Sequence, residues 1–302
     1  MREWLLQTRK WLSRLTLVGL TKLLKLGKLC SPLVPYRFGL WTGGMIGLAA
    51  YYLLPRERKR TIDHLTFAYS DKGKEWVRKT ARRCFVHLGK ALLEMLLMTP
   101  YRLSRVVDVE GEENIRAALR LGKGAIYVTG HIGNWELMAH IVASRFTLSV
   151  IAAPIEPEQV NDMLVGLRAD MGVKTILRGR PGAVKEIIRV FKENRIMGIL
   201  IDQDTDVESA FVDFMGKPAW TPTAAASMAA KFGVPVIFGY IHRNWDNRHT
   251  IRIEGPLDLT VTDDKEKDII TNTAMLTKKI ENCIRAVPEQ WVWMHRRWRR
   301  QP

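Results

Sequence analysis

A histidine in a glycine-framed turn is the first feature of this sequence that could do chemistry. His131 follows the apolar, β-prone run 125–129 and lies between Gly130 and Gly133, at the mouth of a strand-to-helix turn. Glu136 falls in the first turn of the next helix, from where its carboxylate could return to the imidazole. Such a partner fixes the tautomer and leaves the other ring nitrogen free to accept a proton. The pair predicts a general base, although a turn histidine and a glutamate that complements the helix dipole would give the same pattern.

Two further carboxylates, Asp202 and Asp204, follow the apolar run 196–201. An Asp-x-Asp at a strand end can hold a divalent cation on a nucleotide sugar, as in a metal-dependent glycosyltransferase. Alternatively, the pair caps loop amides and pairs with arginines such as Arg168 or Arg178. We favour the second interpretation because nothing nearby resembles a nucleotide pocket.

Arginines near residue 174 could contact a phosphate or a developing oxyanion. They are Arg168, Arg178 and Arg180, and for each one taken singly a solvated surface side chain is the favoured interpretation. The sequence lacks a Gly-x-Ser-x-Gly elbow, a Walker loop, a dinucleotide glycine fingerprint and a His-Glu-x-x-His helix. No protein nucleophile is therefore visible, and the nucleophile is expected to be a hydroxyl of the substrate, with no metal or bound cofactor required.

The pattern from residue 106 onward alternates between strands and helices. Expected strands are 106–110, 125–129, 147–153, 174–177, 196–201, 235–242 and 249–254, and expected helices are 112–121, 134–144, 157–171, 181–193, 222–232 and 265–286. This alternation predicts an α/β fold with a mixed, largely parallel sheet flanked by helices and ligands at the carboxyl ends of the strands. Two polar-faced helices are expected between residues 56 and 99.

Charge and tryptophan content indicate an anionic partner. The 302 residues include 47 Lys and Arg against 31 Asp and Glu, a net charge of +16, and 10 Trp. Indole rings settle at the headgroup boundary, so a membrane surface is favoured over nucleic acid. The three dispersed cysteines suggest a reducing compartment without a disulfide framework or zinc site.

The N-terminal part is expected to associate with the membrane. Residues 1–30 combine apolar residues at helical spacing with interspersed basic residues, which favours an interfacial amphipathic helix over a cleaved signal peptide. The charge-free run 38–54 is either a shallow anchor or a core helix packed through its glycines. We therefore divide the chain into membrane-associated helices, 1–55, and an α/β domain, 56–302.

Four ordered motifs resemble the lipid A biosynthesis acyltransferases, a family related to the His-x4-Asp/Glu glycerolipid acyltransferases. The first is the run from His131 to Leu137, and the second is Leu200 to Asp204. The others are Phe214 to Ala219 with Thr221 and Thr223, and Pro288 to Trp298. The resemblance covers residues 30–302 approximately, and four motifs in order are far more specific than a histidine and a glutamate alone.

The resemblance implies transfer of a fatty acyl chain from acyl carrier protein or coenzyme A to a hydroxyl of an anionic glycolipid. The implied location is the cytoplasmic face of the bacterial inner membrane. By the family pattern, His131 is the general base, Glu136 its partner and Arg168 an active-site arginine. Asn134, Asp202 and Asp204 match motif positions without an assigned role. Family members usually carry a clearer N-terminal span than residues 1–30 supply, which leaves the mode of anchoring open. Separately, an acyltransferase of this kind could act on a glycerophospholipid or another bacterial glycolipid instead.

Overall fold

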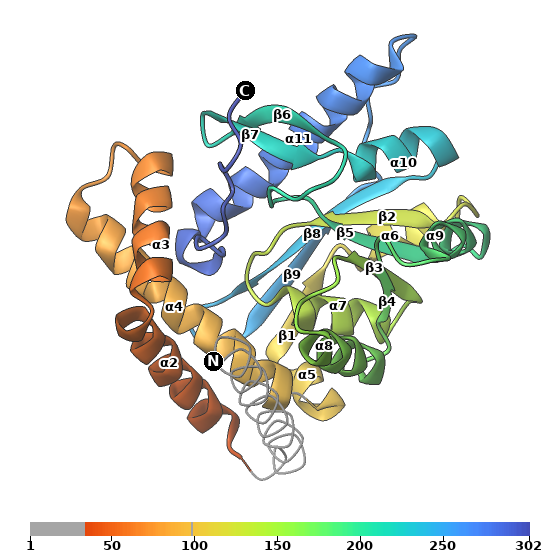
Figure 1. Ribbon diagram of the computed structural model, residues 1–302. Helices are drawn as coiled ribbons and strands as arrows, with labels where there is room; N and C mark the ends of the chain where they lie inside the picture. Colours follow the sequence, from red (N-terminus) through yellow and green to blue (C-terminus); the bar gives the residue numbers. More distant parts are fainter. Residues whose placement is uncertain (1–33, 98) are drawn as a thin grey trace, which may run out of the picture.

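A seven-stranded sheet forms the centre of the protein (Figure 1). The computed structural model describes residues 34–97 and 99–302, so the amphipathic helix expected over 1–30 lies outside the described residues. The strands are β1 Val107–Glu110, β2 Ala125–Thr129, β3 Leu148–Ala152, β4 Lys174–Leu177, β5 Ile196–Leu200, β8 Val236–Arg243 and β9 His249–Glu254. Their order is β1-β9-β8-β2-β5-β3-β4, and only β8 and β9 pair antiparallel. The expected mixed, largely parallel sheet is confirmed.

Helices cover both faces of this sheet. They are α6 Glu112–Leu119, α7 Trp135–Ala143, α8 Glu158–Asp170, α9 Ala183–Lys192, α10 Ala224–Phe232 and α11 Lys265–Ala286. Side chains alternate along β2, so that Ile126 and Val128 pack in the core with α9, α10 and α11, whereas Tyr127 packs with α6 and α7. All five residues of β2 are buried, as the uninterrupted apolar run predicted.

A β-hairpin that the sequence analysis did not predict packs on α11. It consists of β6 Ser209–Phe214 and β7 Lys217–Pro222, joined at Met215 and Gly216, which have φ angles of 59° and 75°. Two left-handed residues define a tight hairpin turn. The Met215 amide donates to the Glu281 carboxylate of α11 at 2.9 Å. The motif that resembled a family loop is thus a hairpin.

The first helices of the described residues form a layer beside the sheet (Figure 1). They are α2 Tyr36–Leu53, α3 Pro55–Ala68 and α4 Lys74–Leu97, followed by the short α5 Pro100–Val106. The two helices expected between 56 and 99 are confirmed. The boundary at residue 55 stays a prediction.

Glycines allow α2 and α4 to cross in backbone contact. A Cβ atom on Gly43 would lie 2.6 Å from the Gly89 carbonyl oxygen, and one on Gly47 would lie 2.1 Å from the Phe85 carbonyl oxygen. Only glycine permits this approach. The glycine packing that the sequence allowed for 38–54 is therefore confirmed, while the opposite side of α2 exposes Phe38, Trp41 and other apolar side chains. Across 34–97 and 99–302, no helix reaches the length and apolarity needed to cross a bilayer.

Candidate active site

His131 and Asp202 meet because β2 and β5 are neighbouring parallel strands in register. Thr129 lies opposite Leu200, so the residues that follow the two strands emerge side by side. The Nδ1 of His131 lies 2.7 Å from Oδ1 of Asp202, and the His131 backbone amide donates to Oδ2 at 2.7 Å. The expectation that Glu136 holds the imidazole is wrong, since Asp202 occupies Nδ1. Capping of a loop amide by Asp202 is confirmed.

Asp202 is a buried, fully hydrogen-bonded carboxylate. Its exposure is 1%, and the indole Nε1 of Trp291 also donates to Oδ2, at 2.7 Å. Burial alone would raise the pKa of this carboxyl. The charge of His131 and the hydrogen bonds from His131 and Trp291 outweigh burial, so the pKa lies well below its usual range. An ionised Asp202 only accepts hydrogen bonds, so His131 carries a proton on Nδ1, and the neutral ring keeps a lone pair on Nε2.

Glu136 instead pairs with Arg168 of α8. The guanidinium donates from Nε to Oε2 at 2.9 Å and from Nη2 to Oε1 at 2.5 Å, and both side chains are largely buried. The reason is geometric, because the helix that begins after Asn134 carries Glu136 toward α8, where a planar guanidinium satisfies both carboxylate oxygens. The sequence analysis had placed Glu136 beside His131 and had offered Arg168 as a partner of the aspartates, whereas the two residues pair with each other.

Asn134 caps α7 and links the histidine turn to a buried charge cluster. Its Oδ1 accepts from the Leu137 amide at 3.2 Å, so the Asn134 side chain caps the N-terminus of the helix. Its Nδ2 donates to Oε2 of Glu94, on α4, at 3.0 Å. The next turn residue, Gly133, has φ of 62°, and a Cβ there would lie 2.1 Å from the Ile241 carbonyl oxygen. The turn therefore requires glycine at this position.

Glu94 is the residue near the site that the sequence analysis missed. It is fully buried and receives two guanidinium hydrogen bonds from Arg243 at 2.7 and 2.5 Å. Its Oε1 also lies 2.9 Å from His249 Nε2 and accepts from the Tyr36 hydroxyl at 2.5 Å. One carboxylate thereby ties α2, α4, the β8–β9 hairpin and the histidine turn together. A charged residue inside the apolar face of a predicted helix was the available signal.

Asp204 and Arg178 lie outside this hydrogen-bonded group. Asp204 is buried and accepts from Arg299 Nη2 at 3.2 Å and from the Arg300 amide at 3.1 Å. The expected pairing of the aspartates with Arg168 or Arg178 is therefore wrong, although Asp204 does pair with arginines. Arg178 has no side-chain hydrogen bond or ion pair to the residues that the structure describes. Within the same residues, no group of three or more His, Cys, Asp or Glu could hold a metal ion.

The C-terminal motif clamps the histidine turn. Ile132 forms an isolated antiparallel bridge with Trp291, and the Gly133 amide donates to the Gln290 carbonyl at 2.8 Å. The Gln290 side chain in turn exchanges two hydrogen bonds with the Arg243 backbone, at 2.7 and 2.8 Å. The tail therefore fixes the turn that carries His131 and supplies a donor to Asp202.

Aromatic rings surround the imidazole. The Trp135 ring centroid lies 4.9 Å from that of His131, and the His295 centroid lies 5.4 Å away. Burial, together with the nearby His131, lowers the pKa of His295 to about 4. His295 is thus neutral at pH 7 and adds no positive charge beside His131.

An apolar cavity of about 60 Å³ adjoins the site between the sheet and helices α7 and α8. Trp135, Glu136 and Arg168 line the cavity, and so does Thr129, two residues before His131. The rest of the lining is mainly aliphatic, and includes Ala139, Val142, Leu148, Val150 and Leu200. The sequence could not identify the lining as a whole, because it comes from five separate elements, β2, α7, β3, α8 and β5.

The chain is similar to a known family of bacterial acyltransferases over nearly its whole length. The family profile described as bacterial lipid A biosynthesis acyltransferase matches residues 5–300. The lipid A biosynthesis lauroyltransferase of Escherichia coli (strain K12) is 25% identical over 303 residues, covering 99% of this chain and 94% of that protein. The palmitoleoyltransferase of the same organism is 24% identical over 275 residues, 89% of this chain and 87% of that protein.

A second group of relatives has a different acceptor in its name. The phosphatidylinositol mannoside acyltransferase of Mycobacterium tuberculosis (strain CDC 1551 / Oshkosh) is 24% identical over 209 residues, 67% of this chain. The match spans 63% of that relative, less than two thirds of its length. Since the family profile covers nearly the whole chain, including the histidine turn, Asp202 and the C-terminal clamp, this protein belongs to the bacterial lipid A biosynthesis acyltransferase family.

Proposed function

We propose that this enzyme transfers a fatty acyl chain from a thioester of acyl carrier protein or coenzyme A to a hydroxyl of a lipid A precursor or a similar anionic glycolipid. The observation that carries the proposal is the His131–Asp202 pair, which leaves Nε2 available as a base beside an apolar cavity. The family and the names of its lipid A relatives support the substrate class. The proposed place of action is the cytoplasmic face of the bacterial inner membrane.

In the proposed reaction, His131 Nε2 takes the proton of the acceptor hydroxyl as its oxygen attacks the thioester carbonyl. Asp202 stabilises the imidazolium that forms and keeps the ring oriented. The tetrahedral intermediate then expels the thiolate. The thiolate accepts from His131 the proton that the acceptor hydroxyl gave up. A thiol has a pKa near 8.5, so it leaves readily.

We assign Arg168 to the oxygen of the thioester. Glu136 engages two of the five guanidinium N–H donors, so the others stay available to an oxyanion at the cavity. Glu136 is then a positioning residue that acts through Arg168. Asn134 positions the histidine turn, while a substrate contact by Arg178 or Asp204 stays a prediction.

The Glu136→Gln variant tests that assignment. We expect kcat to fall about 10- to 100-fold with little change in KM, because the amide no longer holds the guanidinium as a charged partner does. Glu158→Gln provides the matched control, since Glu158 is exposed and pairs with Arg180. Steady-state kinetics of both variants provide the measurement. A rise in KM alone would instead assign the pair to ground-state binding.

The apolar cavity is the proposed site of the acyl chain. Its volume of about 60 Å³ is far below the roughly 300–1,000 Å³ of ligand pockets, so α7 or α8 must move outward for a chain to enter. The mainly hydrocarbon part of the lining is suited to an acyl chain, while Glu136 and Arg168 lie at the cavity as its charged residues.

Ala139→Leu should shorten the preferred acyl chain. Ala139 lies one helical turn after Trp135, and the larger side chain would project into the cavity. We expect the ratio of kcat/KM for long over short donors to fall about tenfold, because one or two methylenes in an apolar pocket change discrimination by about this factor. Ala169→Leu, on the exposed side of α8, is the control. An unchanged ratio in a folded Ala139→Leu variant would place the chain elsewhere.

Acceptor identity is tested by comparing lipids from cells with and without the gene by mass spectrometry. Loss of one acyl chain from lipid A supports the proposed acceptor. A second candidate is a glycosylated glycerophospholipid, which the names of the mycobacterial relatives favour. A missing acyl group on such a lipid, with lipid A intact, would establish that alternative.

A further inference from the structure

Two joined cavities lie where α4 meets the turn between β8 and β9. Their volumes are about 640 and 610 Å³. Val86, Lys90, Trp245 and Asn247 line both, so the two form one groove. Among the described residues, none lines both this groove and the apolar cavity beside His131. The groove is thus a separate feature of the molecule.

One half of the groove is basic. Lys79, Arg82 and Arg83 are exposed on one face of α4, and Lys90 lies two turns further on. The first three have no ion-pair partner among residues 34–97 and 99–302. Arg243 also lines this half but is neutralised by Glu94. The single carboxylate of the lining is Glu289, so this half carries an excess of positive charge suited to a phosphate.

A buried histidine faces the basic half. His87 is 6% exposed, and burial together with Arg243 lowers its pKa to about 3, so the ring is neutral. The ring donates to the backbone of Gly133, and its Nε2 has no hydrogen-bond partner in the part of the chain that the structure describes. A neutral imidazole that donates through one nitrogen presents a lone pair on the other. The basic half therefore offers cations for an anion, and the neutral imidazole beneath them adds no charge of its own.

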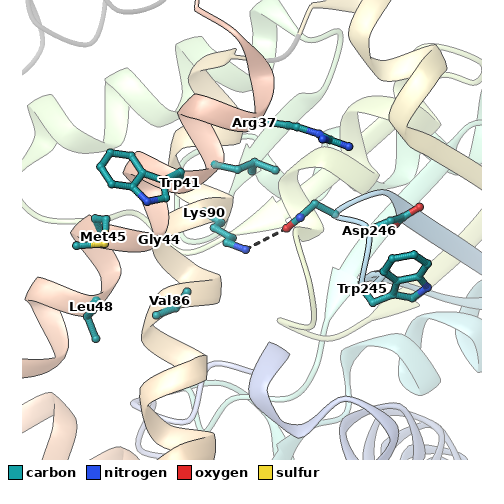
Figure 2. Close-up of a pocket in the computed structure, with 11 residues that line it drawn as sticks. Arg37, Trp41, Gly44, Met45, Leu48, Val86, Lys90, Trp245 and Asp246 are labelled. Atoms are coloured by element: carbon teal, nitrogen blue, oxygen red, sulfur yellow. Dashed lines mark hydrogen bonds between the residues drawn. The ribbon is translucent and has the colours of Figure 1, made fainter.

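The other half of the groove is apolar. Figure 2 shows Trp41, Met45 and Leu48 of α2 and Val86 and Lys90 of α4, with Trp245 across the groove. The Lys90 ammonium donates a hydrogen bond to the side-chain oxygen of Asn247. Trp41 is 61% exposed and Trp245 is 96% exposed. Arg37 and Asp246 are the charged side chains that line this half alone. Further apolar side chains, Phe38, Ile46, Tyr52 and Leu53, are exposed along α2.

We propose that this groove binds an anionic phospholipid of the bilayer, one that the enzyme does not acylate, with its phosphate against Lys79, Arg82 and Arg83 and its acyl portion between Trp41 and Trp245. The ligand fits both halves at once, since it joins a charged, hydroxyl-bearing headgroup to hydrocarbon. A free phosphate would leave the apolar half unused. Exposed tryptophans beside basic side chains are typical of surfaces that lie at the headgroup boundary.

Vesicle binding by the full-length protein tests the proposal. The variant Lys79→Gln/Arg82→Gln/Arg83→Gln is compared with Arg120→Gln/Lys185→Gln/Lys192→Gln, which removes the same charge from exposed positions on other elements. On vesicles of phosphatidylglycerol and phosphatidylcholine, we expect the first variant to bind about 100-fold more weakly than wild type. The control should stay within a few-fold. Trp41→Ser/Trp245→Ser should also weaken binding, with the loss persisting at high salt, since apolar insertion is not screened.

Four results would overturn the proposal. The first is equal vesicle binding by the two charge variants, and the second is displacement of the wild type from vesicles by millimolar inorganic phosphate. The third is loss of binding to isolated acyl carrier protein in the groove variant, which would assign the surface to an acidic protein. The fourth is a raised KM for the glycolipid in detergent, which would make the groove part of the substrate cleft. Vesicle binding does not depend on catalysis, so failure of the proposed reaction would be seen separately.

Discussion

Asp202→Asn is expected to lower kcat about 10³- to 10⁴-fold while the protein stays folded. The amide can donate toward Nδ1 of His131, which favours the tautomer with the proton on Nε2 and removes the base. It also removes the charge that stabilises the imidazolium. Single-turnover acyl transfer with a thioester donor measures the effect, and circular dichroism checks the fold.

The companion variants make this result specific. Asp206→Asn is the control, because Asp206 is an exposed aspartate near the same strand end, with a 94% exposed side chain that pairs with Arg300. It should keep activity within about twofold. His131→Ala should lose as much as Asp202→Asn, and the double variant no more than either, since the two residues act as one unit. Near-normal turnover in either single variant would contradict the proposed base.

Glu94→Gln is expected to lower the free energy of unfolding by about 3–5 kcal/mol. The substitution leaves the buried Arg243 guanidinium without a compensating charge and places an amide donor against His249 or Asn134. Urea unfolding at pH 7 measures the loss. The matched control is Glu75→Gln, an exposed position on the same helix, where stability should change by less than about 0.5 kcal/mol.

The pH dependence of this loss has a definite sign. Burial would raise the pKa of Glu94, but His249 and Arg243 outweigh burial and hold the pKa well below the usual range of a glutamate. A depressed folded-state pKa contributes stability above the unfolded-state pKa, and this contribution is lost as the pH falls toward the folded-state pKa. The difference between wild type and Glu94→Gln should therefore be full above about pH 5 and shrink in more acidic solution. A constant difference from pH 7 to pH 3 would show that the charge of Glu94 is not the cause.

Most of the fold could be predicted from periodicity. Strands 125–129, 174–177 and 249–254 and helix 265–286 match the expected limits, because continuous apolar runs and amphipathic spacing are local properties. The β6–β7 hairpin was missed because Pro218 and Pro222 interrupt the pattern of its second strand. Pro218 faces Asp213 and Pro222 faces Ser209, at the two ends of an isolated two-stranded ribbon.

The sequence by itself determined the catalytic histidine candidate, the strand-end position of Asp202 and the family. Only the tertiary structure decided that Asp202 holds His131, that Glu136 holds Arg168, and that Glu94 links four elements from inside the core. The reason is that spacing along a chain reports which residues leave an element together, whereas the order of strands in a sheet brings distant residues together. Once β2 lies beside β5, residues 131 and 202 are neighbours, although 71 positions separate them.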